Sequence, residues 1–141
     1  MSLARPNNYR VYFATVLTLF LCACGGTDEY IIIGTARMVS AEGQIRLSKI
    51  DEDARRINLE LERLPPPSSL QPEFQRYTAW FVDAAGRATK AGDMTYDPSL
   101  RQASLVTTAP MDSFTLKVTA EETIEASLPS QFVVARQSIP E

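Results

Sequence analysis

The stretch Ile57-Asn58-Leu59-Glu60-Leu61-Glu62 alternates apolar and polar side chains at every step. Successive side chains of a β-strand point to opposite faces of the sheet, so this period of two predicts a strand with one buried face and one solvated face. An amphipathic helix would instead repeat its apolar residues every three or four positions. The centre of this 141-residue chain is therefore predicted to be β-structured.

Several other stretches support an all-β fold. Residues 114–119 repeat the same alternation, and residues 44–48 repeat it over a shorter span. Residues 77–82 and 131–135 are apolar on both faces, which is typical of central strands covered on two sides. Weaker strand candidates are residues 30–37, 92–96 and 103–107.

Turn-forming residues separate these candidate strands. Residues 83–86 predict a hairpin loop in which Gly86 takes a positive φ, and the proline run at 65–67 ends a strand because proline cannot donate to a central ladder. Further turns are expected at 42–43, 51–53, 97–98 and 109–110, and at most one helical turn within 121–127. Seven or eight short strands at this spacing predict an antiparallel β-sandwich over residues 30–141.

From Leu64 onward an ordered series of residues resembles a known family. The series contains Leu64-Pro65-Pro66, Tyr77-Thr78-Ala79-Trp80, Asp83, Gly86, Ala91-Gly92, residues 114–121, Pro129 and Val133-Val134. It is similar to the extracytoplasmic domain of anti-sigma-K-type factors over roughly residues 56–137, and it implies an immunoglobulin-like sandwich. Those factors also carry a cytoplasmic helical domain, often with a His/Cys zinc motif, and a transmembrane helix. This sequence shows neither, so their sigma-factor activity is not carried over, and no ligand or catalytic residue comes with the resemblance.

The first 23 residues have the pattern of a bacterial export signal. Arg5 and Arg10 precede an apolar run from Val11 to Leu21, which is too short to span a bilayer as a helix. The end of this run, Leu21-Cys22-Ala23-Cys24, resembles the lipobox of bacterial lipoproteins. The resemblance implies cleavage after Ala23, a diacylglycerol on the Cys24 thiol and usually an acyl chain on its new amino group. Two or more chains anchor a protein stably, whereas one does not.

Alternatives to this assignment remain open at the sequence level. Cys22 is the rival acceptor, but it follows the bulky Leu21, and an ordinary cleaved signal would leave Cys24 as a free thiol. Gly25 is not the aspartate that in enteric bacteria tends to retain lipoproteins at the inner membrane, which favours the outer membrane. Residues 24–29 are expected to be a short tether of about 13 Å average span.

Composition restricts the possible functions. Removal of residues 1–23 leaves 12 basic and 17 acidic residues, a net charge of −5, which disfavours a nucleic-acid partner. The chain has no histidine, so Ser-His and Cys-His nucleophiles, imidazole zinc ligands and the usual neutral-pH proton carrier are all missing. Both cysteines lie at the signal junction, so no disulfide framework is expected.

Three groups of residues are the remaining candidates for chemistry. Asp51-Glu52-Asp53 would offer oxygen ligands to calcium, but a solvated turn is the favoured interpretation. Glu121, Glu122 and Glu125 would serve a two-carboxylate hydrolase, but an exposed acidic loop is favoured. Tyr77, Trp80 and Phe81 would line an aromatic groove, but a place in the sandwich core is favoured.

These observations predict a lipid-anchored outer-membrane lipoprotein whose domain is a structural or protein-interaction module. We expect no catalytic residue, no metal and no cofactor, with lipidation at Cys24 as the one assigned modification. The expected partners are the membrane, through the lipid, and an envelope protein, with an edge strand available for strand addition. The alternatives are an envelope sensor or small-ligand-binding domain and, as a third choice, a carboxylate-dependent hydrolase.

Overall fold

The structure is a computed structural model that describes residues 26–52 and 54–141. These residues form nine strands and one short helix: β1 (Thr27–Gly34), β2 (Glu42–Lys49), β3 (Arg55–Glu62), α1 (Pro67–Leu70), β4 (Arg76–Val82), β5 (Ala88–Asp93), β6 (Thr95–Asp97), β7 (Gln102–Ala109), β8 (Phe114–Glu121) and β9 (Val133–Ile139).

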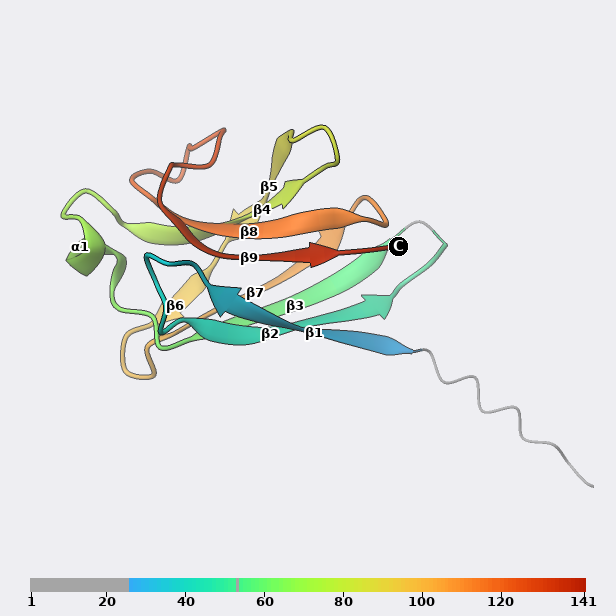
Figure 1. The fold of residues 1–141 in the computed structure, drawn as a ribbon, viewed down its shortest axis with the longest axis horizontal. Helices are drawn as coiled ribbons and strands as arrows, with labels where there is room; N and C mark the ends of the chain where they lie inside the picture. The colour runs from blue at the N-terminus through green and yellow to red at the C-terminus, as the bar shows by residue number, and fades with distance from the viewer. Residues whose placement is uncertain (1–25, 53) are drawn as a thin grey trace, which may run out of the picture.

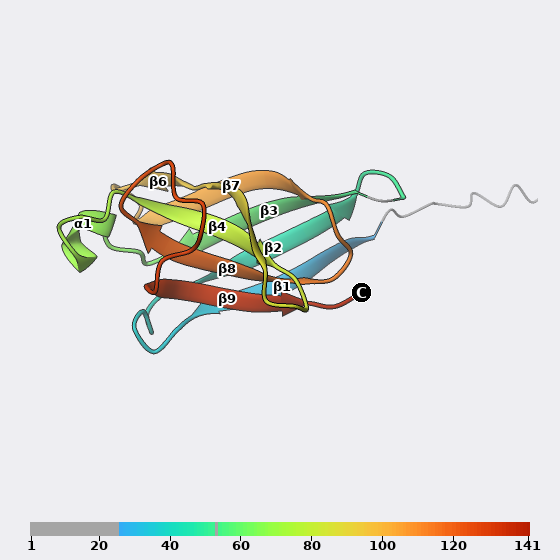
Figure 2. The same cartoon turned by 90° about the horizontal axis from the view of Figure 1, so that it is seen from above.

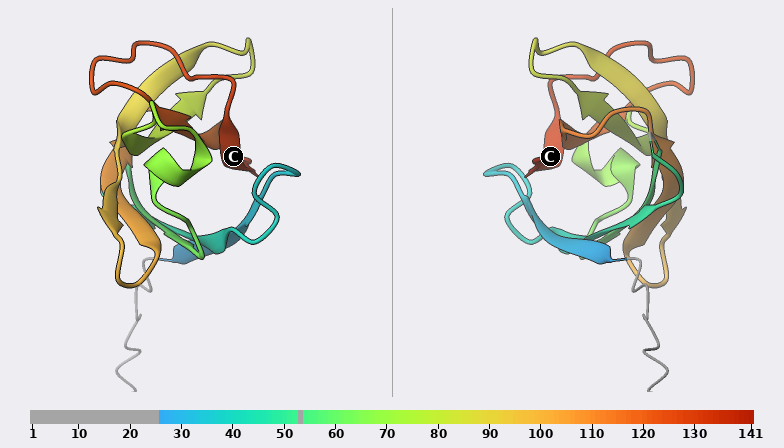
Figure 3. Two further views of the ribbon diagram at one scale, coloured as in Figure 1. Left: turned by 90° about the vertical axis from the view of Figure 1, so that its left-hand side faces the viewer. Right: turned by 90° about the vertical axis from the view of Figure 1, so that its right-hand side faces the viewer.

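All nine strands belong to one antiparallel sheet in the order β5-β4-β8-β9-β1-β2-β3-β7-β6. The sheet curls until it is nearly barrel-shaped, as the end-on views show (Figure 3). Two broad groups of strands can be followed along it, β5-β4-β8-β9 and β2-β3-β7-β6, with β1 joining them (Figures 1 and 2). The prediction of an all-β antiparallel fold is therefore confirmed, with nine strands in place of seven or eight.

The alternation that predicts β3 also sets the inner and outer faces of the sheet. Ile57, Leu59 and Leu61 are buried in the core, whereas Glu60 and Glu62 are exposed on the outer face. β4 differs because Tyr77 to Phe81 are all buried, as expected for a strand covered on two sides. Aromatic rings on the inner side meet edge to face, with Phe81 and Phe114 centroids 5.0 Å apart.

The two ends of the sheet are joined by a bent strand. β5 pairs with β4, and after the single residue Met94 the chain continues as β6, which pairs with β7. The Met94 amide donates to the Tyr77 carbonyl, and the Thr107 hydroxyl donates to the Ala91 carbonyl across the closure. Strands that switch sides through a bend are a usual way to make such a corner. The bend brings both ends of the sheet around one core.

Gly43 lies at a point where two backbones approach closely. A Cβ built on Gly43 of β2 would lie 1.9 Å from the Glu60 carbonyl oxygen of β3, far inside van der Waals contact. The Glu42-Gly43 pair, expected to form a turn, is instead the start of β2, and its glycine is required by this close approach.

Several boundaries also differ from the sequence predictions. β1 starts at Thr27, so the last three residues of the expected tether belong to the sheet, where they pair with residues 46–48. β9 starts at Val133 instead of residue 131. In the described part of the chain the helix lies not in residues 121–127 but at Pro67–Leu70, where proline at the first helical position fits the missing N–H.

Candidate interaction surface

The predicted signal peptide and Cys24, the predicted site of lipidation, lie outside the described residues. Three residue steps separate Cys24 from Thr27, and this length of chain spans at most about 11 Å. The end of the molecule where β1 begins also carries the β2–β3 loop and the C-terminus (Figure 1). The opposite end carries the β1–β2 loop and α1, so position along β1 defines distance from any anchor at Cys24.

The first acidic candidate group is at the β1-start end of the molecule. Asp51 and Glu52 are exposed in the β2–β3 loop, and Asp53 lies outside the described residues. Within residues 26–52 and 54–141 there is no group of three or more His, Cys, Asp or Glu side chains that would hold a metal ion.

The second acidic group is divided by the structure. Glu122 and Glu125 are exposed in the connection between β8 and β9, as expected. The expectation is wrong for Glu121, which is the last residue of β8 and only 4% exposed. Its carboxylate accepts hydrogen bonds from the Thr119 hydroxyl and the Ser130 amide, and neither donor is a second carboxyl group. The structure thus places Glu121 in a polar network and not in a carboxylate pair.

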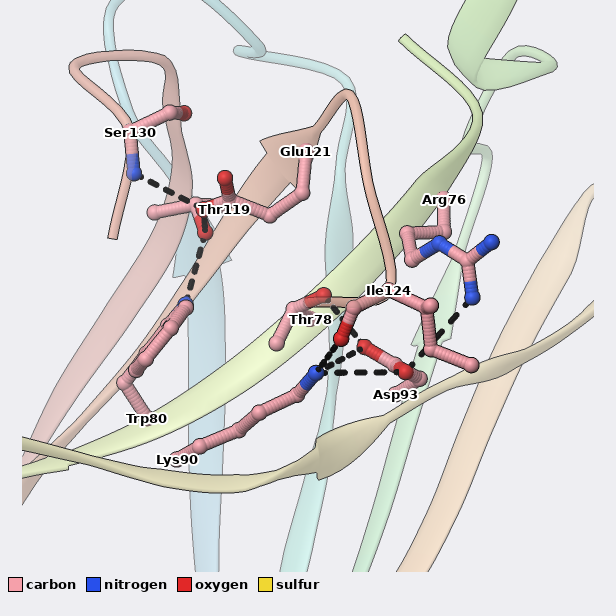
Figure 4. A network of polar contacts seen from close by, with 9 residues as sticks. All are labelled: Arg76, Thr78, Trp80, Lys90, Asp93, Thr119, Glu121, Ile124 and Ser130. Atoms are coloured by element: carbon pink, nitrogen blue, oxygen red, sulfur yellow. Dashed lines mark hydrogen bonds and ion pairs between the residues drawn. The ribbon is translucent and has the colours of Figure 1, made fainter. Parts of the chain in front are cut away.

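The three aromatic candidates lie on two different faces of β4. Tyr77 and Phe81 belong to the inner core, as favoured from the sequence, and burial raises the pKa of the Tyr77 hydroxyl, which donates to the Pro65 carbonyl. Trp80 is fully buried but is not part of that core, because it points to the opposite face of β4. Its indole N–H donates to the Thr119 hydroxyl over 2.8 Å (Figure 4). The core prediction therefore holds for two of the three aromatic residues.

A second polar cluster holds the β8–β9 connection against this outer side of β4. The Lys90 ammonium donates to the Ile124 carbonyl over 2.7 Å and lies 3.1 Å from an Asp93 carboxylate oxygen (Figure 4). Asp93 also accepts from the Thr78 hydroxyl and faces Arg76 at 3.5 Å. Burial opposes ionisation of Asp93, but Thr78, Lys90 and Arg76 outweigh it and hold its pKa below the ordinary value. This cluster stabilises the β8–β9 connection on the outer side of β4.

The outer face of β1 exposes two large apolar side chains. Ile32 is fully buried, whereas its neighbours Ile31 and Ile33 are 71% and 64% exposed. Isolated exposed apolar residues are common, but two on one strand face at the centre of a sheet form a candidate contact point.

The strand register places Ile33 at the centre of a row of charged residues. Reading directly across five neighbouring strands, the outward residues are Glu62 of β3, Glu42 of β2, Ile33 of β1, Arg136 of β9 and Lys117 of β8. We call these five residues the charge-divided row. Two acidic residues lie on one side of Ile33 and two basic residues on the other.

Both halves of the charge-divided row contain like charges directly opposite one another. Glu42 faces Glu62, and Lys117 faces Arg136, and such cross-strand pairs destabilise a sheet. Glu42 is partly compensated by an exposed ion pair with Arg63. Among the described residues, Glu62, Lys117 and Arg136 form no ion pair. The monomer therefore keeps one unfavourable charge pair on each side of the exposed Ile33.

Open hollows accompany both halves of the row. The acidic side has one of about 470 Å³, lined by Ile31, Glu42, Gly43, Gln44, Arg46, Glu60 and Glu62. The basic side has one of about 360 Å³, lined by Thr35, Ala36, Arg37, Lys117, Gln131, Val133 and Arg136. Small-molecule sites are mostly apolar with a few placed polar groups, whereas these hollows are lined mainly by polar and charged side chains. They suit a charged protein surface better than a small apolar ligand.

The edge of β1 is also partly free. In the described residues β1 pairs with β9 only at Ile33 and Gly34, so residues 27–32 have a strand partner on the β2 side alone. Figure 1 shows β1 and β9 side by side at that point and diverging toward the end where β1 begins.

The sequence interpretation did not find the charge-divided row. The three isoleucines at 31–33 were the only local signal, and a continuous apolar run does not say which residue is exposed. The charged residues of the row are up to 94 positions apart in the chain, so only the register brings them together.

Comparison of the chain with protein-family models, with curated proteins and with solved structures finds no match. Within the described residues, no helix has the length and apolar character needed to cross a bilayer.

Proposed function

We propose that this protein is a lipid-anchored component of the bacterial cell envelope that acts, without catalysis, as a protein-interaction module. The anchor is Cys24, and the interaction surface is the outer face of β1 with the charge-divided row. The observation that carries the proposal is the exposure of Ile31 and Ile33, with Ile33 between charge pairs of opposite sign, on a strand that begins at Thr27.

The anchor half of the proposal is supported by the export pattern and by the short distance to the domain. Each buried methylene contributes about 0.8 kcal/mol to membrane attachment, so two or three acyl chains make it effectively permanent. With only Gly25 and Gly26 between Cys24 and β1, the domain stays next to its membrane, which we propose is the outer membrane.

The interaction half is supported by the energetics of the outer face. Burial of one aliphatic side chain contributes about 1.5–3 kcal/mol, so covering the exposed parts of Ile31 and Ile33 contributes roughly 2–4 kcal/mol. The row also defines its partner's chemistry: an apolar centre with basic groups facing Glu42 and Glu62 and acidic groups facing Arg136 and Lys117. Such an arrangement selects both partner and orientation.

The strand order supports assigning the curled sheet to the immunoglobulin-like sandwiches. In those domains one sheet has the order A-B-E-D and the other adds C′ to C-F-G. Here β2-β3-β7-β6 and β5-β4-β8-β9 follow that order, and β1 bridges the two sheets. This order is compatible with the anti-sigma-K-type resemblance, which remains a prediction. Trp80 lies on the strand equivalent to C but points away from the shared core.

Metabolic labelling tests the anchor. The wild-type chain and Cys22→Ser are expected to incorporate labelled palmitate and to sediment with membranes, and Cys24→Ser to do neither. Equal labelling of Cys24→Ser and wild type would overturn the assignment.

Thiol accessibility tests the surface. Ile33→Cys and Val106→Cys are matched variants, because Val106 of β7 is 67% exposed on the outer face of another strand. In intact envelope membranes a membrane-impermeant maleimide added to the face that bears the protein should label position 106 several-fold faster than position 33, with equal rates after detergent solubilisation. Equal rates at the two positions in membranes would contradict an occupied surface.

A further inference from the structure

The charge-divided row is complementary to itself. Across β3, β2, β1, β9 and β8 its charges run negative, negative, neutral, positive, positive. A half-turn about an axis through the neutral centre converts this order into its opposite. We infer that the partner of the outer face of β1 is a second copy of this chain, an inference that rests on the proposed function.

The symmetry axis follows from the order of charges. A two-fold axis that lies in the contact plane and runs parallel to β1 stacks Ile33 on Ile33 of the other copy. The same rotation places Glu42 against Arg136, and this contact occurs twice, whereas Glu62 and Lys117 lie farther from the axis, where the sheet curls away from the contact. The interface is therefore isologous and closed, which limits assembly to a dimer.

The position of the anchor selects the same axis. A two-fold axis parallel to β1 keeps both strands running in the same direction, so both copies begin β1 at the same end of the dimer. Both lipidated cysteines then reach one membrane surface. An axis perpendicular to the strand would place the two anchors at opposite ends, which two short linkers of at most about 11 Å cannot bring to one bilayer.

Dimerisation also relieves the two unfavourable pairs within the monomer. Glu42 facing Glu62 and Lys117 facing Arg136 are repulsive in one copy, and in the dimer the member of each pair nearer the axis, Glu42 or Arg136, meets an opposite charge of the other copy. The contact surface is small, and anchoring confines both copies to one membrane, which raises their effective concentration. We therefore expect the dimer in membranes at protein densities where a solution of free domains would be monomeric.

Cross-linking of the full-length protein in envelope membranes tests the inference. Gln44→Cys places a thiol one strand away from the axis, and Val106→Cys places one on a strand remote from the axis. A short bis-maleimide is expected to join two copies at position 44 at least tenfold more efficiently than at position 106. The parent chain with its own cysteines provides the baseline.

Charge reversal tests the pairing across the axis. In the Gln44→Cys background, Glu42→Arg would face Arg136 of the other copy, and Arg136→Glu would face Glu42. Each single reversal is expected to lower cross-linking about tenfold, and the double reversal Glu42→Arg/Arg136→Glu is expected to restore it. Within one chain β1 separates residues 42 and 136, so rescue reports contact between copies.

Urea denaturation of each variant shows whether a loss of cross-linking results from unfolding. Arg136→Glu faces Lys117, and Glu42→Arg faces Glu62, so each single reversal replaces a repulsive cross-strand pair with an attractive one. Glu42→Arg also loses the exposed ion pair with Arg63, which contributes at most about 1 kcal/mol. The single variants are therefore expected to unfold at urea concentrations close to or above the wild-type midpoint.

Equal cross-linking at positions 44 and 106, or no effect of the single reversals, would overturn the inference. Protection of Ile33→Cys without any homodimer would overturn it as well, yet would leave the proposed function standing with a different envelope protein as partner. Failure of both measurements would remove both proposals.

Discussion

Substitution of Thr119 tests the hydrogen-bond network formed by Trp80, Thr119 and Glu121 on the outer side of β4. Its hydroxyl accepts a hydrogen bond from the Trp80 indole and donates one to the Glu121 carboxylate, and all three side chains are buried. Thr119→Val keeps the shape of the side chain and removes both hydrogen bonds. Trp80 then keeps a buried N–H without an acceptor, and Glu121 retains the Ser130 amide as its remaining donor.

The size of the effect follows from these two losses. An unsatisfied buried donor costs about 1–3 kcal/mol, and a hydrogen bond to an ionised group contributes about 1.5–3 kcal/mol. The added methyl group recovers a small part, so we expect Thr119→Val to lower the free energy of unfolding by about 3–4 kcal/mol. Thr115→Val is the matched control on the same strand face, and we expect it to change stability by less than about 0.5 kcal/mol.

Urea denaturation followed by tryptophan fluorescence measures this directly, because Trp80 is the only tryptophan in the chain and is fully buried. The midpoint should fall while the slope of free energy against urea stays constant. In a Trp80→Phe background, followed by circular dichroism, Thr119→Val should cost roughly 1–3 kcal/mol less, because no indole donor remains. Equal stability of Thr119→Val and Thr115→Val would refute the assigned role of the network.

Three other variants test separate parts of the account. Gly43→Ala should destabilise the fold by about 2 kcal/mol or more, because its Cβ would lie 1.9 Å from the Glu60 carbonyl oxygen; an unchanged urea midpoint would show that the strands separate easily. Asp93→Asn should cost about 1–2 kcal/mol near neutral pH. Because the folded-state pKa of Asp93 is lowered, this difference should be complete above about pH 5 and shrink as the pH falls below about 4, where a constant difference would argue against an ionised Asp93. Lys90→Met should release the β8–β9 connection by removing the bond to the Ile124 carbonyl, so glutamyl endoprotease should cut there roughly 5–30-fold faster than in the wild type; equal rates would show that other contacts hold the connection.

The strands themselves could be predicted because their signal is local. The alternation of residues 57–62 predicts β3, and the unbroken apolar run of 77–82 predicts a strand covered on both faces, which is how β4 is buried. Neither pattern says what covers each face. Trp80 lies outside the main core because it points to the outer side of β4, where its indole N–H donates to Thr119.

Glu121 shows the same limit for polar residues. An acidic run at the end of a strand normally indicates a solvated loop, and that holds for Glu122 and Glu125. Glu121 is buried because Thr119 and Ser130 provide hydrogen-bond donors, and Ser130 lies nine positions further along the chain. The sequence shows that these two donors exist, but it does not show where the fold places them relative to Glu121.

The candidate surface depends even more on long-range register. Ile31 and Ile33 are exposed because Ile32 occupies the inward position of β1, and an apolar run alone does not set that phase. Glu42 and Arg136 flank Ile33 only because β1 pairs with both β2 and β9. The end of the domain that a lipid on Cys24 would hold at the membrane, by contrast, follows directly from the few residues between Cys24 and Thr27.

The distance between two copies in a lipid bilayer is the sharpest test of the parallel dimer. Sheets pack about 10 Å apart and neighbouring strands lie about 4.8 Å apart, so Gln44 Cα atoms should be about 14 Å apart across the axis, and those of Val106 beyond about 30 Å. Pulsed dipolar spectroscopy of the full-length lipidated protein, spin-labelled at one position or the other, measures both separations. For the parallel dimer we expect a short distance at position 44 and a long one at position 106. Absence of a short distance at position 44, or the reverse order of the two separations, would contradict it.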